Sequence, residues 1–465
     1  MLFNSFEFLI FFPIVVGLYY ILPHTKRWIL LLLSSYYFYM CWKPEYVILI
    51  LLSTIVDYYC AKIIYRSKKE RVKKSFLMVS MLSNLSVLVF FKYFNFFGET
   101  AMAMCSSFNI FIGFEPFDYL LPVGISFYTF QTMSYTIDVY RGNSQPENHF
   151  GKFALYVSFF PQLVAGPIER ASNIIPQFYK KINFNYEGVR DGILLFFWGM
   201  FKKVIIADRI AEYVNIVFEN PMEYGGIIST IAVFFFGVQI YCDFSGYSDI
   251  AIGCALILGV RLMKNFKQPY FANSLKDFWS RWHISLSTWF RDYLYIPLGG
   301  NRVVKWRWYY NLFITFLVSG LWHGAAWGFI IWGAIHGIII VLESSRYSQI
   351  PLPNILRITL TFCVVSFCWI FFRAETAEKS FDFIMSMFLS PQSAINLFQS
   401  PIDFYLSLLF IVILFVLEFI NERVGIKKIL WNLHAIYRWI LFIMLLLILV
   451  FFGRMESQDF IYFQF

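Results

Sequence analysis

Long apolar runs recur along this chain, and they restrict its possible folds more than any other feature. Examples are "FLIFFPIVVGLYYILP", "YVILILLSTIVDYY" and "WILFIMLLLILVFFG", and several runs approach the roughly 20 residues that a helix needs to cross a bilayer. Of the 465 residues, 59% are hydrophobic and 14% are charged, whereas soluble domains carry about 25% charged residues. The sequence therefore predicts an integral membrane protein without a large soluble domain.

The runs predict an all-α polytopic membrane protein with roughly ten to thirteen crossings, some of them re-entrant or broken. We expect a single transmembrane domain over residues 1–453, followed by a tail over residues 454–465. The candidate spans lie near residues 2–22, 28–42, 46–65, 76–97, 119–140, 153–165, 188–207, 226–260, 308–343, 355–373, 402–420 and 435–453.

Basic residues are concentrated in short loops between the candidate spans, and they indicate the orientation of the chain. "RSKKERVKK" (residues 66–74) and "HTKR" (residues 24–27) are expected on the cytoplasmic side, which places the N-terminus outside. "NERVGIKK" (residues 421–428) is also basic, so the last span should run outward and the tail should be extracytoplasmic. The net charge of +9 is therefore interpreted as an orientation signal and not as evidence for nucleic-acid binding.

Two segments in the middle of the chain, residues 141–186 and 261–307, lack the apolar continuity of clean spans. Both are rich in Arg, Lys, Asn, Pro and Trp, and both are embedded between membrane helices. Irregular backbone is tolerated at membrane depth only where it is buried in protein or lines a wet cavity. We therefore expect amphipathic or re-entrant segments near an active site.

His323 is a candidate functional residue because it lies inside a long apolar stretch, "SGLWHGAAWGFIIWGAIHG". A polar side chain at membrane depth is costly and usually faces a cavity or a partner. Gly320, Gly324 and Gly328 recur at four-residue spacing, which would strip one helix face of side chains. The glycines serve either close helix packing, with His323 as a core hydrogen-bonding residue, or a channel beside the imidazole.

His283 is the second candidate, in "DFWSRWHISLSTWFRDYLYIPLGG". If this segment is one helix, its aromatic residues form a stripe with His283 at the margin. Such a helix either lies in the membrane interface, anchored by tryptophans, or forms the floor of an active site. His336 is nearer to a packing role, while His24, His149 and His434 are expected at solvated or interfacial positions.

The chemistry open to these residues is limited by what the chain lacks. It contains no GxSxG nucleophile elbow, HExxH zinc motif or Walker-type phosphate loop. Its seven cysteines lie mostly in apolar runs without CxxC spacing, so neither a disulfide framework nor a metal site is expected. An imidazole can act as general base and then as general acid, which leaves histidine-assisted acyl transfer.

The chain ends on "FIYFQF", which contains one tyrosine, Tyr462. A terminal segment is normally polar, so an aromatic end requires an explanation. One interpretation is an apolar end that folds back onto the protein. The other is that Tyr462 has a function, which the position of the tail would place outside the cytoplasm.

Five stretches together resemble the membrane-bound O-acyltransferase family, and more narrowly its bacterial branch that O-acetylates alginate or peptidoglycan. The resemblance covers essentially the whole length, and the pairing of "RWHIS" with "LWHG" is specific to it. The stretches are "SFYTFQTMSYTIDVYRG" (126–142), "FFPQLVAGPIERA" (159–171), "YCDFSGYSDIAIG" (241–253), "NFKQPYFANSLKDFWSRWHISLSTWFRDYLYIPLGGNR" (265–302) and "SGLWHGAAWGFIIWGAIHG" (319–337).

The resemblance implies a ring of helices around a thin central partition, with a cytoplasmic and an outer funnel, in the bacterial inner membrane. It implies that His323 is catalytic, with His283 as the second histidine, and that acetyl-CoA is the donor substrate, with no bound cofactor. Relatives end in a tyrosine-bearing hexapeptide that passes the acyl group to a periplasmic partner of the SGNH hydrolase type. Tyr462 matches that tyrosine, and peptidoglycan is the expected polymer, with alginate or another exopolysaccharide as the alternative.

Other charged residues are assigned less specific roles. Lys264, Lys267 and Arg302 are candidates to neutralise the phosphates of coenzyme A, although a positive-inside charge bias also explains them. Asp243 and Asp249 either orient a histidine or water, or satisfy buried backbone groups.

Two other classes of function remain open. A lipid transporter or flippase would use the histidines as a proton relay, but it predicts paired internal repeats that the sequence lacks. A non-catalytic scaffold for a polymer synthase predicts that both histidines tolerate replacement by alanine. Neither assigns a role to Tyr462.

Overall fold

The computed structural model describes the chain with a few short gaps, and its backbone is helical. No strand occurs in the part of the chain that it describes, so the predicted all-α class is confirmed. The described residues are 1–110, 113–117, 120–164, 166–345, 352–388, 401–454 and 460–461.

Seven of the described helical segments are long and apolar enough to span a membrane. They are Pro44–Arg66, Glu70–Ser107, Gly226–Ile257, Trp327–Ser344, Asn354–Arg373, Pro401–Arg423 and Ala435–Phe452. Other candidate spans are shorter or divided: residues 153–165 become two short helices, and residues 308–343 become two helices that meet at a break after His323. The candidates near residues 2–22, 28–42 and 119–140 form helices of 16, 17 and 16 residues, so shorter helices account for much of the difference from the expected number of crossings.

The chain forms two compact units, and two of the three boundaries between them lie inside helices. Unit 1 comprises residues 1–195 and 251–263, and unit 2 comprises residues 196–250 and 264–465. The single domain over residues 1–453 therefore stays a prediction.

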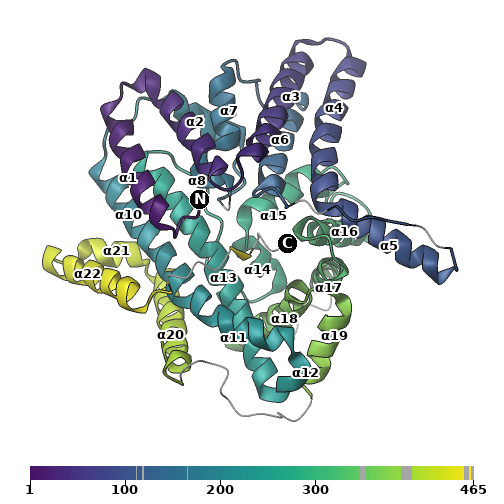
Figure 1. The fold of residues 1–465 in the computed structure, drawn as a ribbon, viewed down its shortest axis with the longest axis vertical. Helices are drawn as coiled ribbons and strands as arrows, with labels where there is room; N and C mark the ends of the chain where they lie inside the picture. Colours follow the sequence, from purple (N-terminus) through teal and green to yellow (C-terminus); the bar gives the residue numbers. More distant parts are fainter. Residues whose placement is uncertain are drawn as a thin grey trace. The chain divides into compact units, whose positions relative to one another are not determined.

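Unit 1 contains the N-terminal helices, shown from purple to blue in Figure 1. Its π-helical segment η2 joins two helices into one long element, and short 3-10 segments cap others. The elements are α1 (Phe6–Ile21), α2 (His24–Met40), η1 (Pro44–Tyr46), α3 (Val47–Arg66), α4 (Glu70–Leu88), η2 (Val89–Tyr93), α5 (Phe94–Ser107), α6 (Ile125–Tyr140), α7 (Phe150–Ser158), α8 (Phe160–Leu163), α9 (Ala171–Ile174), η3 (Ile175–Tyr179) and most of α10 (Tyr186–Met200).

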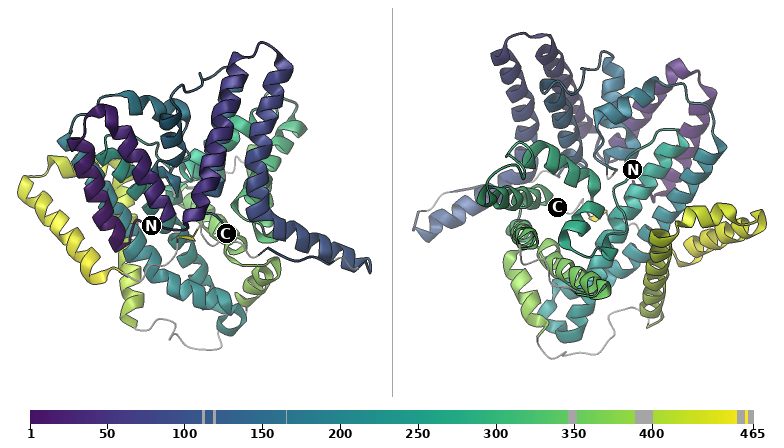
Figure 2. Two further views of the ribbon diagram at one scale, coloured as in Figure 1. Left: turned by 45° about the horizontal axis from the view of Figure 1, so that its top comes forward. Right: turned by 180° about the vertical axis from the view of Figure 1, so that it is seen from behind.

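Interhelical hydrogen bonds hold α3, α4 and α6 together in unit 1, where Figure 2 shows α3 and α4 side by side. The Asp57 carboxylate on α3 is fully buried. It accepts hydrogen bonds from Ser80 Oγ, from Asn84 Nδ2 at 2.8 Å and from Thr136 Oγ1 at 3.1 Å. Neutral donors from two neighbouring helices thus satisfy a buried acid that would otherwise destabilise the unit.

Unit 2 contains the elements that carry both candidate histidines. Its longest helix, α13, begins in unit 2 and ends in unit 1. The elements are η4 (Phe201–Ala207, π-helical), α11 (Asp208–Glu219), α12 (Pro221–Tyr224), α13 (Gly226–Ile257), η5 (Pro269–Phe271), α14 (Leu275–Arg281), α15 (Ile284–Phe290), η6 (Arg291–Tyr295, π-helical), α16 (Lys305–His323), α17 (Trp327–Ser344), α18 (Asn354–Arg373), α19 (Ala377–Ser386), α20 (Pro401–Arg423), α21 (Ile426–Asn432) and α22 (Ala435–Phe452).

The glycines around His323 serve close packing, and the interpretation that they share one helix face is wrong. Because α16 ends at His323, Gly320 lies on α16 whereas Gly328 lies on α17. A Cβ atom at Gly320 would lie 2.3 Å from the carbonyl oxygen of Phe329, and one at Gly328 would lie 2.5 Å from that of Phe371. Neighbouring backbone therefore fills the space beside these glycines, which leaves no channel along them.

We predict that Gly320→Ala destabilises unit 2 by about 1–3 kcal/mol, because the added methyl group must separate α16 from α17. Gly17→Ala on α1 is the matched control, since a Cβ there meets nothing within 4 Å. That control should be neutral, or stabilising by about 0.5–1 kcal/mol. Thermal unfolding of the detergent-solubilised variants measures both effects, and equal midpoints would contradict the close packing.

Candidate active site

His283 lies at a break between α14 and α15, so the expectation of one continuous helix through this segment is wrong. Its backbone is left-handed, with φ of 41° and ψ of 53°, and it forms the N-cap of α15. A residue with a side chain pays roughly 1–2 kcal/mol for this conformation. Such strain persists only where surrounding contacts impose it, and it is concentrated at functional sites.

The contacts that impose the break come from residues 265–267. Asn265 accepts a hydrogen bond from the backbone N–H of Ile284 at 2.9 Å and, through Oδ1, one from Ser285 Oγ at 2.8 Å. On the other side of the break, the N–H of Lys267 donates to the carbonyl oxygen of Arg281 at 2.9 Å. This extended segment therefore holds both sides of the His283 turn.

The turn directs His283 into the interior of unit 2, and the interfacial-helix alternative does not fit this burial. The side chain is fully buried, and its ring packs edge-to-face on Phe244 at 4.6 Å between ring centres. Burial lowers the pKa of His283 to about 3, so the imidazole is neutral at physiological pH.

His323 is the last residue of α16 and lies close to His283, with 6.4 Å between the ring centres. It is buried among aromatic rings and packs edge-to-face on Trp332 at 5.1 Å and on Phe372 at 5.3 Å. Two imidazoles from elements 40 positions apart in the sequence thus reach one small apolar region. An imidazole can act as general base and then as general acid.

His336 supports the wall of this region. It is fully buried on α17, and its Nδ1 accepts a hydrogen bond from Trp279 Nε1 at 3.3 Å. Trp279 also packs edge-to-face on Trp332, with 5.6 Å between ring centres. His336 therefore orients a tryptophan, in keeping with the packing role expected for it.

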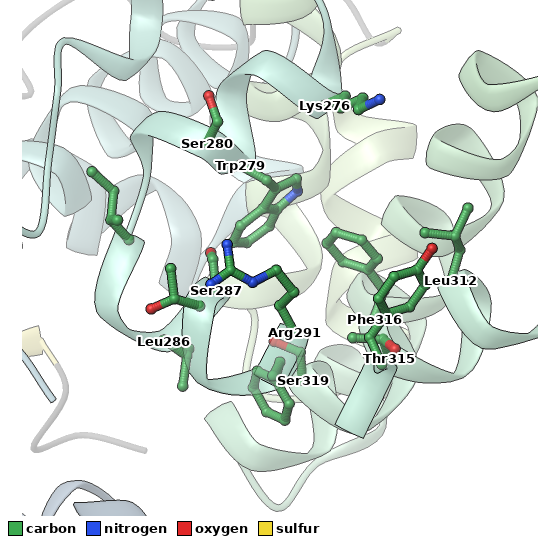
Figure 3. A pocket seen from close by; sticks show the side chains of 14 residues that line it. Lys276, Trp279, Ser280, Leu286, Ser287, Arg291, Leu312, Thr315, Phe316 and Ser319 are labelled. Atoms are coloured by element: carbon green, nitrogen blue, oxygen red, sulfur yellow. The ribbon is translucent and has the colours of Figure 1, made fainter. Parts of the chain in front are cut away.

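A cavity of about 360 Å³ lies beside Trp279 (Figure 3). It combines two basic side chains, several hydroxyl groups and aromatic rings. Ser319 lines it and lies one turn before His323 on α16, so the two share a helix face. The lining residues are Lys276, Trp279, Ser280, Ile284, Leu286, Ser287, Thr288, Phe290, Arg291, Tyr295, Leu312, Thr315, Phe316 and Ser319.

The predicted donor-binding residues lie outside this lining. Lys264, Lys267 and Arg302 are all exposed. The basic residues at the cavity are instead Lys276 and Arg291, also exposed. The sequence does not single out Lys276 and Arg291 as binding residues, because each adjoins an acidic residue and resembles part of a surface ion pair.

Two residues of the C-terminal hexapeptide lie in the interior of unit 2. Phe460 is fully buried, with its ring centre 4.5 Å from that of Tyr247 and 5.8 Å from that of Phe244. Ile461 is also buried, and its N–H donates to Asp243 Oδ2 at 2.7 Å. Tyr462 lies outside the described residues. The start of the hexapeptide therefore folds back, beside the same Phe244 ring that contacts His283.

Two lysines that the sequence reasoning did not single out complete this region. Lys203 Nζ lies 2.7 Å from Asp243 Oδ1 and 2.8 Å from Asp208 Oδ1, and Lys202 Nζ lies 2.6 Å from Asp249 Oδ2. The sequence feature that could have indicated these lysines is the "KK" pair inside the apolar run before Asp208. Asp243 thus satisfies a backbone group, one of the roles considered for it, while Asp249 forms an ion pair.

We predict that His283 makes the protein less stable as the pH falls from about 6.5 to about 3. In that window the unfolded histidine binds a proton and the folded one does not, so unfolding takes up protons and stability is lost as the pH is lowered. His283→Asn keeps a residue that tolerates left-handed backbone but removes the titration. Relative to that variant, the wild type should lose up to about 1.4 kcal/mol per pH unit.

Thermal unfolding of both proteins across this pH range measures the difference. His434→Asn, the same substitution at an exposed histidine, is the matched control. Parallel pH curves for the wild type and His283→Asn would show that His283 titrates normally.

Comparisons with known proteins show the family of the chain. The family model of the membrane-bound O-acyltransferases matches residues 147–377, which include both histidines. The chain is 40% identical over 397 residues to the probable alginate O-acetylase AlgI of Pseudomonas aeruginosa, covering 83% of this chain and 75% of that protein. It is 38% identical over 395 residues to the peptidoglycan O-acetyltransferase of Helicobacter pylori, covering 78% and 73%.

The chain is also 29% identical over 280 residues to the teichoic acid D-alanyltransferase of Bacillus subtilis, which covers 54% of this chain and 69% of that protein. With its apolar helices and these matches, the chain is a multi-pass membrane acyltransferase that belongs to the membrane-bound O-acyltransferase family.

Proposed function

We propose that this protein transfers acetyl groups from cytoplasmic acetyl-CoA through the inner membrane to Tyr462. A periplasmic SGNH-hydrolase-type partner then takes the acetyl group to a cell-envelope polysaccharide. Peptidoglycan is the proposed polymer, and alginate or another exopolysaccharide is the alternative; the chain is similar to relatives named for each of these polymers. Both termini are then extracytoplasmic, in agreement with the basic loops.

A continuous series of ring contacts in unit 2 carries this proposal. It begins at Phe460 in the hexapeptide and passes through Phe244 and His283 to His323, with ring centres 5.8, 4.6 and 6.4 Å apart. From His323 it continues through Trp332 to Trp279, which lines the cavity, with separations of 5.1 and 5.6 Å. The two histidines thus lie between the start of the tyrosine-bearing hexapeptide and a cavity suited to a donor.

The proposed step uses His323 as the base. A tyrosine hydroxyl has a pKa near 10 and stays protonated at neutral pH, so it needs a positioned base to attack a thioester. The imidazole takes the phenolic proton as the tyrosine oxygen forms a bond to the acetyl carbon, and the carbon–sulfur bond breaks. The proton then passes to the coenzyme A thiolate, so atoms and charges balance. His283, neutral and close by, orients the reacting groups.

The location of the chemistry inside a membrane protein has a physical reason. Coenzyme A carries several phosphate charges and cannot enter the hydrocarbon core, whereas an acetyl group is small and neutral. In this proposal Lys276 and Arg291 bind the donor's anionic groups at the cavity, and the hydroxyl groups along the lining accompany its polar arm. Only the acetyl group then moves between the two sides.

We predict that acetyl-CoA adds a single acetyl group to Tyr462, and that His323→Ala abolishes this addition. Intact mass spectrometry of the C-terminal peptide measures it, with Tyr462→Phe as the acceptor control. His434→Ala is the matched histidine control, because His434 is exposed on another part of unit 2. In that variant Tyr462 should be acetylated as in the wild type. Release of coenzyme A in the presence of the polymer partner without any acetyl-tyrosine would refute the shuttle and indicate direct transfer.

We also predict that Lys276→Gln and Arg291→Gln each raise the KM for acetyl-CoA roughly 2- to 5-fold, because each removes a partly solvated contact to an anion. The kcat should change little, since neither side chain reaches the histidines. Steady-state release of coenzyme A measures both constants. The triple variant of Lys264, Lys267 and Arg302 tests the competing assignment: if that variant raises KM and the cavity variants do not, the donor binds through the sequence-predicted residues.

A further inference from the structure

We infer that Asp243 is a positioning residue that docks the C-terminal tail in unit 2 through a backbone hydrogen bond. It accepts the N–H of Ile461, which is joined by one peptide bond to Tyr462. The inference rests on the proposed function in one respect: the tail that Asp243 holds is the acyl acceptor. The contact itself is independent of the transfer chemistry.

The two oxygens of the Asp243 carboxylate have separate partners. Oδ1 lies 2.7 Å from Lys203 Nζ, and Oδ2 accepts from the N–H of Ile461 at 2.7 Å. Lys203 is shared, because Asp208 Oδ1 lies 2.8 Å from the same ammonium group. All three charged side chains are buried, so one positive charge serves two carboxylates. A backbone N–H directed at Asp243 compensates part of the remaining negative charge, and such charge-assisted bonds are among the stronger ones.

The neighbouring contact fixes the register of the tail. Tyr247 lies one turn after Asp243 on α13, and Phe460 packs on its ring at 4.5 Å. One face of α13 therefore holds the ring of residue 460 and the amide of residue 461. Because the two contacts engage successive residues, a shift of the tail by one position would lose both.

The beginning of the tail is attached to the same part of unit 2. The N–H of Arg454 donates to the carbonyl oxygen of Val204 at 3.1 Å, one residue after Lys203 on η4. The Arg454 guanidinium also lies 3.4 Å from Asp403. The tail thus leaves α22 beside the element that carries Lys203 and returns to the carboxylate that Lys203 holds.

A purely structural role for Asp243, as a counter-ion of Lys203, makes a different prediction. That role requires only the ion pair between Lys203 and Asp243 and does not depend on the tail. Docking instead requires the amide hydrogen of residue 461 and tolerates changes in its side chain. The two roles are therefore separated by variants on the tail that leave Lys203 and Asp243 intact.

The first experiment measures hydrogen exchange of the C-terminal peptide in the full-length protein. Asp243→Asn should accelerate exchange of that peptide roughly 10- to 100-fold, as expected for weakening a hydrogen bond to a charged group. Asp249→Asn is the matched control: the same change on the same helix, at a carboxylate that pairs with Lys202 and not with the tail. It should leave tail exchange at the wild-type rate.

The second experiment measures acetylation of Tyr462 in a single turnover. Ile461→Pro removes the amide hydrogen and should slow acetylation roughly 10- to 100-fold, whereas Ile461→Val keeps the hydrogen and should acetylate at close to the wild-type rate. The double variant with Asp243→Asn should be no slower than the slower single variant, because both changes remove one contact. If the losses in acetylation rate of the two single variants multiply in the double variant, the docking role is overturned. Equal hydrogen exchange of the tail in Asp243→Asn and Asp249→Asn would also overturn it.

The two experiments also separate this inference from the proposed function. If tail exchange depends on Asp243 but no acetyl group ever reaches Tyr462, the docking contact stands and the acyl shuttle falls. If acetyl reaches Tyr462 while the tail exchanges at an unprotected rate in the wild type, the shuttle stands and the docking contact falls.

Discussion

A polar group inside an apolar interior must have a partner, and this constraint organises both units. In unit 1, three neutral donors converge on the buried carboxylate of Asp57 and tie α3, α4 and α6 together. In unit 2 the solution is ionic: Lys203 lies between Asp208 and Asp243. Breaking such a pair leaves an uncompensated buried charge, which costs about 3–5 kcal/mol. The positions of the helices that carry these groups are thereby fixed.

In the proposed function, the same constraint favours histidines among aromatic rings over a charged base. A carboxylate beside the acetyl group would need its own counter-ion, whereas an imidazole is neutral when buried and accepts a proton only as the hydroxyl attacks. His283 and His323 are buried and pack on the rings of Phe244, Trp332 and Phe372. In the proposed function, an apolar lining of this kind would protect a thioester and an acetyl-tyrosine from hydrolysis.

The sequence was informative where one residue type is costly in its surroundings. The apolar runs predicted the helices, and the cost of an imidazole at membrane depth indicates His323 as a candidate, whose role stays a prediction. The sequence failed where the answer depends on distant contacts. The left-handed turn at His283 is imposed by Asn265, almost 20 positions earlier, and local periodicity continues smoothly through it. The glycine spacing misled for a related reason, because nothing local shows that α16 ends at His323.

An acceptor tyrosine on the chain's own tail changes the kinetics of the proposed transfer. Tethering converts encounter with the acceptor into an intramolecular step, so the site does not wait for a dilute substrate. Docking must nevertheless be reversible, because an acetyl group held in the interior cannot reach an external partner. One charge-assisted hydrogen bond contributes about 1.5–3 kcal/mol, and burial of Phe460 and of Ile461 contributes about 1.5–3 kcal/mol each. Together they would leave the tail released in about one molecule in 10³ to 10⁷. In the proposed shuttle a partner captures this released population, so the docking contact has to be strong enough to hold the tail and weak enough to release it.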